Sequence, residues 1–400
     1  MKQVVTETTK YMWRSEKNRL FMILSTALVV LYTFFVIPNI SGEDEINLEM
    51  MEREMMGNVV QFEDALDDGL IVPSNTTGTT AYSSLRREYV KQRELLTALS
   101  HGDVHRFIDI SYRPSNAMSK ADDGISQIVF QLLGYELEQP FQRSKNKVYE
   151  NEIENLTFHI IHDRTSLQQL HLFLIGFGPM LLFIGLIFLI SDVHVKDRSL
   201  QTQKIGVPMS WQKYTFIQAI TALAFVGMFY LALGIVFVLI NGILHGFGTF
   251  DLPIGYYMPY FELGFLNQEN YQAQTIGWFM LQVIPYLAVL GYLFTRLNTL
   301  FSLWTKQSVV TMVLGIFTLL FQFIYYGNDS EELLGMDISL FPQTYFDFGK
   351  ILTGRFEQQL LVEYPNLFTR GLTVLGITAL IIELLIFAST KAITRQKFVS

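Results

Sequence analysis

The sequence contains no cysteine in its 400 residues, which excludes disulfide bonds, thiolate metal sites and cysteine nucleophiles. Charge is scarce as well, because charged residues make up 16% of the chain, against roughly 25% in an ordinary soluble domain. Apolar residues account for 50% of the chain. A sequence this poor in charge and this rich in apolar side chains is typical of a membrane protein.

Signatures of enzymes are also missing. The chain has no G-x-x-x-x-G-K-[ST] motif, so we expect it not to bind ATP in the P-loop manner by itself. Asp347-Phe348-Gly349 matches a short kinase element but stands without the other kinase motifs. The histidine pairs His101/His105 and His159/His162 would need a carboxylate partner to hold a metal. We therefore predict no catalytic residue, no metal site, no cofactor bound by this chain and no nucleic-acid partner.

Long uncharged apolar runs are the main feature of the sequence. The first, at residues 20–38, is long enough to cross the hydrocarbon core as a helix. It exceeds the apolar region of a signal peptide, and no A-x-A-like site follows, so we interpret it as a retained span. Five further runs follow at residues 170–190, 216–240, 276–293, 309–326 and 372–388. The predicted fold is an all-α polytopic membrane protein with six transmembrane helices.

A polar insert of domain size, residues 39–169, separates the first and second spans. Residues 41–168 contain 22 acidic and 12 basic side chains, a net charge of 12 − 22 = −10. Apolar side chains recur there at helical spacing, as at Leu85, Tyr89 and Leu96, which predicts a helical domain. Its acidic excess could attract a cationic peptide or ion, or could simply be soluble surface.

Lysine and arginine are unevenly distributed among the segments between the spans. Residues 1–19 contain five and residues 191–215 contain four, whereas residues 241–274 contain none. Basic residues in short loops resist translocation. We therefore expect both termini and residues 191–215 in the cytoplasm, and the insert and residues 327–371 on the outside of the plasma membrane.

The N-terminal segment, residues 1–19, combines its basic residues with Tyr11 and Trp13 directly before the first span. Aromatic and basic residues at this place are typical of an interfacial helix on the inner leaflet. A plain basic anchor for the first span is the alternative.

Helix breakers and polar side chains are few within the predicted spans. Gly176 and Gly178 with Pro179 predict a kink in residues 170–190. Glu383 is a formal charge at depth, which suggests a function, although it could also snorkel or pair with Arg296 or Lys391. Three glutamines could either join neighbouring helices or line a pathway: Gln218, Gln282 and Gln322.

The basic loop at residues 191–215 carries an ordered pattern of residues, Asp197-Arg198-x-x-x-Thr202-x-Lys204-x-x-x-Pro208-x-Ser210-x-x-Lys213. This pattern resembles the permease subunits of type-2 ABC exporters. In that family, an acidic residue, a short coupling helix and a Pro-x-Ser turn lead from the second span into the third. The usual glutamate is Asp197 or Asp192 here, and the usual Gly-Thr pair is reduced to Gln201-Thr202.

A second match precedes the last span. Pro342-Gln343-Thr344-Tyr345-Phe346 resembles the Pro-x-x-Tyr-Phe segment of the same family, which is followed by a short helix with a lysine, here Lys350. In the family this part of the chain dips back toward the outer leaflet. The order of one span, a large external insert and five more spans is similar to that of the sodium and peptide exporter branch.

The resemblance implies a half-transporter of bacterial origin. Two permease subunits, identical or related, would form the pathway, and a separate ATPase would bring ATP and Mg. Residues 197–209 would form a short amphipathic helix in a groove of that ATPase. Its coupling residues would be Asp197, Arg198, Thr202, Lys204, Ile205 and Pro208. Cargo of this family includes peptides and lipid-like or drug-like amphiphiles, so a role in antimicrobial resistance is also open.

The alternative from another functional class is a sensory or scaffold membrane protein. In that case the extracellular insert would bind a ligand, and the spans would relay the signal or assemble with partners. A neighbouring ATPase gene without spans of its own favours the exporter, whereas a neighbouring kinase gene favours the sensor.

Overall fold

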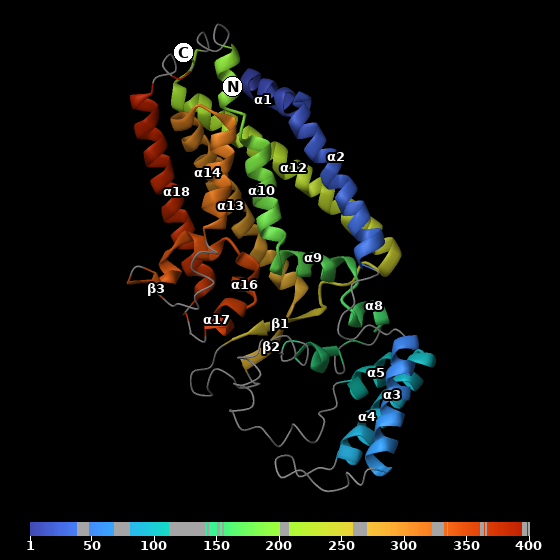
Figure 1. Ribbon diagram of the computed structural model, residues 1–400. Helices are drawn as coiled ribbons and strands as arrows, with labels where there is room; N and C mark the ends of the chain where they lie inside the picture. Colours follow the sequence, from blue (N-terminus) through green and yellow to red (C-terminus); the bar gives the residue numbers. More distant parts are fainter. Residues whose placement is uncertain are drawn as a thin grey trace. The chain divides into compact units, whose positions relative to one another are not determined.

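The computed structural model describes residues 1–37, 48–67, 81–111, 141, 144–149, 153, 156–200, 208–258, 270–321, 332–333, 335–360, 364, 366–393 and 398. The chain folds as two compact units (Figure 1). The first contains Met1–Pro38, Thr165–Asp251 and Ile276–Ser400. The second contains Asn39–Arg164 and Leu252–Thr275, so the predicted insert is joined there by a later segment of the chain.

Helices dominate the first unit (Figure 1). Its long helices and the short helical turns that continue them are α1 (Lys2–Arg14), α2 (Glu16–Leu31), η1 (Tyr32–Val36), α9 (Ser166–Ile175), α10 (Gly178–Ile190), η3 (Val195–Leu200), α12 (Trp211–His245), α13 (Ile276–Thr305), α14 (Ser308–Leu320) and α18 (Leu367–Ala392).

Among the described residues, five helical segments are long and apolar enough to cross a membrane. They are Glu16–Val36, Gly178–Asp197, Trp211–His245, Ile276–Thr305 and Leu367–Ala392. The prediction of a helical, multi-pass membrane protein is confirmed at this level. The remaining apolar helix, α14, has 13 residues. The span predicted at residues 309–326 continues beyond α14 into positions outside the described residues, so the sixth span stays a prediction.

Successive long helices of this unit alternate in direction, so that one end of the bundle carries the start of α2 and the ends of α10, α13 and α18 (Figure 1). We call it the N-terminal end. Side chains join the helices there: the Lys17 ammonium donates to the Ser191 hydroxyl at 3.0 Å, and the Trp304 indole donates to the Ser389 hydroxyl at 2.9 Å.

The kink predicted in residues 170–190 is confirmed, because the chain breaks between α9 and α10 at Gly176 and Phe177. A Cβ atom on Gly178 would lie 2.1 Å from the carbonyl oxygen of Phe173, so the two helices approach too closely for a side chain at this position. Glycine is therefore required for the turn between them.

The helix predicted at residues 276–293 extends to Thr305, which corrects the expectation of a loop around Arg296. The added turns are covered by neighbouring elements, since Phe294, Leu300 and Leu303 are all buried. Burial of this face, rather than a polar boundary in the sequence, determines where α13 ends.

A compact segment lies between α14 and α18. It contains η6 (Ile338–Leu340), η7 (Pro342–Tyr345), α16 (Phe348–Leu352) and α17 (Arg355–Leu360). The helix α16 packs against α9, where a Cβ atom on Gly349 would lie 2.1 Å from the carbonyl oxygen of Leu174. A two-residue strand pair, β3 (Glu332–Leu333) with β4 (Met336–Asp337), precedes η6 and is one exception to the all-α prediction.

The second unit contains the helices α3 (Leu48–Asp67), α4 (Ala81–Ser100), α5 (Val104–Ser111) and α8 (Phe158–Ile161). Ala98, Phe107 and Ile110 form a small buried core against which Phe158 packs. The helical character that the sequence predicts for residues 39–169 is therefore present in the described part of that range. Within the described residues, an antiparallel strand pair, β1 (Pro253–Tyr257) and β2 (Tyr271–Thr275), is a further exception to an all-helical fold.

Candidate functional site

Buried polar side chains gather at the N-terminal end of the first unit, where α10 passes into η3. We call this group the polar cluster: His194, Asp197, Tyr214, Gln218, Asn298 and Thr299. Its members come from the end of α10, from η3 and from the facing turns of α12 and α13. Polar groups removed from water are costly unless they are hydrogen-bonded, so the partners of each group decide how firmly these elements are joined.

His194 bridges two helices. Its Nδ1 lies 2.9 Å from Oε1 of Gln218 on α12, and its Nε2 lies 3.0 Å from the hydroxyl of Thr299 on α13. Because an amide oxygen can only accept, Nδ1 carries the proton that is donated to Gln218. The imidazole is 4% exposed, so both contacts are removed from water.

Asp197 belongs to the first residues of the loop, 192–197, which we call the root of the loop, and it is hydrogen-bonded to α12. The Tyr214 hydroxyl donates to Asp197 Oδ2 at 2.9 Å, and Nε2 of Gln218 donates to the same oxygen at 3.3 Å. Gln218 also donates to the carbonyl oxygen of Val193 at 3.0 Å. Tyr214 and Gln218 are four residues apart, so one face of α12 holds both the end of α10 and the start of η3.

The turn after α10 is also held from the other side by the N-terminal helices. The Lys17 ammonium lies 3.0 Å from Asp192 Oδ1, and the Tyr11 hydroxyl donates to Asp192 Oδ2 at 2.8 Å. The Lys196 ammonium lies 3.4 Å from the centre of the Tyr11 ring. Burial, followed by the Asp192 carboxylate, raises the pKa of Tyr11, so its hydroxyl stays protonated and keeps donating.

An ion pair joins α13 to α18 near the polar cluster. Nη2 of Arg296 lies 2.9 Å from Oε2 of Glu383, and Nε of Arg296 donates to the other carboxylate oxygen. The Tyr292 hydroxyl donates to Oε1 of Glu383 at 2.7 Å. Of the two partners that the sequence suggested for Glu383, Arg296 is therefore the one in contact.

Of the coupling residues predicted from sequence, Thr202, Lys204 and Ile205 lie outside the described residues. Pro208 is exposed, just ahead of α12. Asp197 differs from the expectation of a charge presented to a partner, because it is 1% exposed and faces Tyr214. Asp197 therefore anchors the loop within this chain. Arg198 belongs to η3.

The polar residues that the sequence predicted within the spans do not form one common site. Gln218 belongs to the polar cluster, and Glu383 to the ion pair with Arg296. Gln282 is half-buried on α13, about 21 Å along the helix from Arg296 at 1.5 Å per residue. Gln322 lies outside the described residues.

The residues predicted for the re-entrant segment lie in η7, directly after it, and in α16. Pro342 begins η7. The Tyr345 hydroxyl donates to the carbonyl oxygen of Ser339 at 2.7 Å, and the Phe346 ring centre lies 4.9 Å from that of Phe294 on α13. The exposed Lys350 forms an ion pair at 2.9 Å with Asp347, which is largely buried. The first and last of these contacts hold the segment together, and the ring contact between Phe346 and Phe294 packs it against α13.

Sequence reasoning missed His194, Tyr214, Asn298 and Thr299. Asn298 donates to the carbonyl oxygen of Ile190 at 3.0 Å, so it also joins α13 to α10. One signal was available: the polar run from Thr295 to Ser302 interrupts an apolar helix, and polar residues inside spans commonly join helices.

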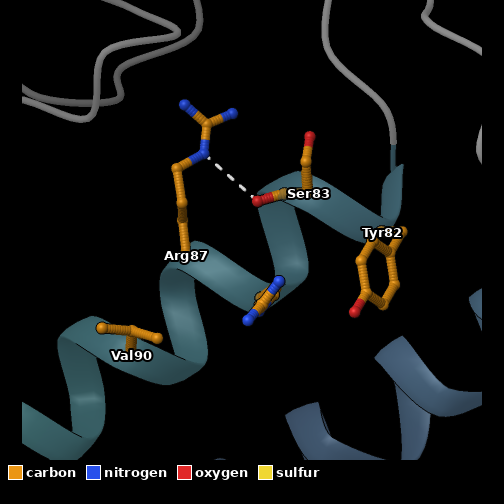
Figure 2. A pocket seen from close by; sticks show the side chains of 5 residues that line it. Tyr82, Ser83, Arg87 and Val90 are labelled. Carbon is orange, nitrogen blue, oxygen red and sulfur yellow. Dashed lines mark hydrogen bonds between the residues drawn. The ribbon is translucent and has the colours of Figure 1, made fainter.

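A hollow in the second unit is lined by described residues of α4. It has a volume of about 460 Å³ and is lined by Tyr82, Ser83, Arg86, Arg87 and Val90. Figure 2 shows Nε of Arg87 donating to the carbonyl oxygen of Ser83, at 3.2 Å. The hollow is open to solvent.

Within the part of the chain that the structure describes, no three His, Asp or Glu side chains are placed to hold a metal ion. Comparisons with models of known protein families, with curated proteins and with solved structures found no match for this chain. Its function is therefore inferred from its own residues.

Proposed function

We propose that this chain is the membrane-spanning permease subunit of an ATP-driven ABC exporter. Two copies, or this chain and a related one, form the pathway through the bilayer. A separate ATPase, carrying ATP and Mg, docks on residues 198–207 in the cytoplasm. The cargo is a peptide or a lipid-like or drug-like amphiphile.

The observation that carries this proposal is the way in which the loop is rooted. Its first residues are bonded to α12 through Asp197 and Tyr214, to α13 through His194 and Thr299, and to the N-terminal helices through Asp192. A loop that served only to connect α10 and α12 would not need contacts with three further helices, α1, α2 and α13. If the ATPase displaces the loop, such contacts would pass the displacement to all of these helices together.

The polar character of these contacts supports the same role. Hydrogen bonds and ion pairs between helices are directional, so they transmit a displacement without the slippage that apolar packing allows. The pair Arg296–Glu383 extends the connection from α13 to α18. A movement of the loop root would therefore reach α10, α12, α13 and α18 as a group.

The test begins with co-purification. Where a gene beside this one encodes an ATPase without spans of its own, the chain is produced with that ATPase, reconstituted into nanodiscs and assayed for ATP turnover with candidate cargo. We expect a stable complex whose turnover depends on the permease. Lys204→Glu is expected to weaken association with the ATPase while membrane insertion is retained.

The root is tested separately by Tyr214→Phe, with Tyr230→Phe as its matched control. Both substitutions remove one hydroxyl hydrogen bond from α12, since Tyr230 donates to the carbonyl oxygen of Leu182 at 2.7 Å. Each is expected to cost about 1 kcal/mol of stability. Only Tyr214→Phe is expected to lower cargo-stimulated turnover. The decrease is about fivefold if the loss of about 1 kcal/mol falls on the complex with the ATPase during turnover.

Two results would contradict the proposal. If no ATPase associates with the chain either in detergent or in nanodiscs, the exporter is excluded, and ligand binding by the second unit would then favour the sensor. If the complex forms but Tyr214→Phe and Tyr230→Phe have equal turnover, the root of the loop does not couple the two subunits.

A further inference from the structure

We propose that the outward face of α1 is a binding surface for the headgroups of anionic phospholipids, with Lys10 and Arg14 as the contacting cations and Trp13 beside them. This inference concerns the membrane and holds whether or not the chain works with an ATPase.

The orientation of α1 is determined by its opposite face. Val4, Thr8 and Met12 are buried at successive turns, and Val4 packs with Tyr214 and Ile217 of α12. The Tyr11 hydrogen bond to Asp192 adds a polar contact on this inner side. The helix therefore cannot rotate to turn its outer residues inward.

The outer face presents cations and an exposed aromatic ring. Lys10 and Arg14 are exposed, and within the described part of the chain neither forms an ion pair. They are four residues apart, which places their Cβ atoms about 5–6 Å from each other on one face. Trp13 is 63% exposed, and its ring also contacts Phe225 of α12 edge-on, with the ring centres 6.5 Å apart. Two adjacent cations can share one phosphate, and an indole ring favours the headgroup level of a bilayer.

The depth of α1 follows from the span that it precedes. The uncharged part of Glu16–Val36, residues 20–36, is about 25 Å long at 1.5 Å per residue, which covers most of the hydrocarbon core. Leu24, Leu28 and Leu31 on this span are 59%, 65% and 55% exposed, as expected of a helix that faces lipid. If residues 20–36 lie in the hydrocarbon, then the charged residues Glu16, Lys17 and Arg19, and α1 before them, lie in the headgroup layer.

Charge decides which headgroups fit. Residues 1–19 contain five basic and two acidic residues, a net charge of 5 − 2 = +3. The acidic residue within α1, Glu7, accepts a hydrogen bond from the Gln3 amide at 3.2 Å. Each basic residue near an anionic surface is worth about 1 kcal/mol, which corresponds to about fivefold in affinity. A zwitterionic headgroup offers no comparable gain.

The experiment reads Trp13 directly. The full chain is reconstituted into vesicles of phosphatidylcholine and phosphatidylglycerol in which one lipid or the other carries brominated acyl chains. The signal of Trp13 is the difference in quenching between the native chain and Trp13→Phe. We expect brominated phosphatidylglycerol to quench this signal more strongly than brominated phosphatidylcholine at equal bulk fraction.

The residues are tested by Lys10→Gln/Arg14→Gln, which is expected to lower the preference for phosphatidylglycerol about 25-fold in relative affinity. Arg86→Gln/Arg87→Gln removes the same charge from α4 and is expected to leave the preference unchanged. Inorganic phosphate, added as a competitor, is expected to have little effect because it lacks the acyl chains that hold the headgroup at α1. Equal quenching by the two lipids, or a preference that survives Lys10→Gln/Arg14→Gln, overturns the proposal. Displacement by inorganic phosphate would overturn the assignment to lipid.

Discussion

Arg296 and Glu383 form an ion pair in which the two side chains differ greatly in burial, with the arginine 1% exposed and the glutamate 27% exposed. The arginine is thus the group that depends on its partner, because a buried cation without a counter-charge is expensive. The Phe216 ring centre, 5.3 Å from Cζ of Arg296, adds a weaker favourable contact.

We therefore predict that Glu383→Gln lowers the free energy of unfolding by about 3 kcal/mol, as expected when one partner of a buried pair is removed. The double substitution Arg296→Met/Glu383→Leu is expected to recover most of that loss, because it removes both charges. Thermal unfolding of the purified protein in one detergent measures both effects. Tyr292→Phe, which removes one hydrogen bond to the same carboxylate, serves as the control and is expected to cost about 1 kcal/mol. A Glu383→Gln variant no less stable than this control would show that Arg296 does not need the charge.

The bridge made by His194 leads to a second prediction. His194→Phe keeps the ring volume but leaves Oε1 of Gln218 without its donor, whereas the Thr299 hydroxyl keeps its hydrogen bond to the carbonyl oxygen of Thr295. We expect it to lower the free energy of unfolding by about 2–4 kcal/mol, for one unsatisfied buried acceptor and one further lost hydrogen bond. Thr299→Val removes one end of the bridge and is expected to cost about half as much. Chemical denaturation in mixed micelles can rank the two variants. Equal losses would mean that a single contact of the imidazole matters.

Gly349 and Gly376 make a matched pair for a third prediction. A Cβ atom on Gly349 would lie 2.1 Å from the carbonyl oxygen of Leu174, whereas nothing lies within 4 Å of the Cβ position on Gly376. We expect Gly349→Ala to destabilise the protein by about 1–3 kcal/mol or more by forcing α16 away from α9. Gly376→Ala is expected to stabilise α18 by about 0.5–1 kcal/mol through helix propensity. The difference in melting temperature between these variants tests the packing of α16, and similar values for both would contradict it.

Much of the fold could be predicted because the apolar runs have no other stable arrangement in a membrane. The kink at Gly176 could be predicted for a different reason, because glycine and proline are strong local signals. The length of α13 could not be predicted from the sequence. Thr295, Arg296 and Asn298 read as a polar boundary in sequence, and only the carboxylate of Glu383 on α18 and the carbonyl oxygen of Ile190 on α10 make them suitable for a helix interior.

The site was less predictable than the fold because its contacts join residues that are far apart in the chain. His194 binds Gln218 at a separation of 24 residues and Thr299 at a separation of 105. Periodicity identifies which residues share a face, but not which helix that face meets. For Asp197, the basic loop around it suggested exposure, whereas the tyrosine at position 214 draws the carboxylate inward.

Two aspartates outside the membrane-spanning segments have pKa shifts of opposite sign. Although burial opposes it, hydrogen bonds from Ser339 and the charge of Arg370 lower the pKa of Asp337 below its ordinary value. This group therefore contributes stability above the ordinary carboxyl pKa, and the contribution is lost as the pH falls through the lowered value. For Asp347, burial raises the pKa despite the Lys350 ammonium 2.9 Å away.

The sign for Asp347 is the reverse. Because the folded chain binds the proton more tightly than the unfolded chain, the stability that this group contributes is fully present below the ordinary carboxyl pKa and is lost as the pH rises through the raised value. Asp347→Asn imitates the protonated form, so we expect this variant to be more stable than the native protein at neutral pH. The gain is reduced by the lost ion pair with Lys350, which is worth about 0–1 kcal/mol because the lysine is exposed. Melting temperatures measured at neutral pH and at about pH 4 should show the gain shrinking in acid, whereas Asp337→Asn should be destabilising at neutral pH. An Asp347→Asn variant that is less stable than the native protein at neutral pH would mean that the ion pair with Lys350 outweighs the cost of burying the carboxylate.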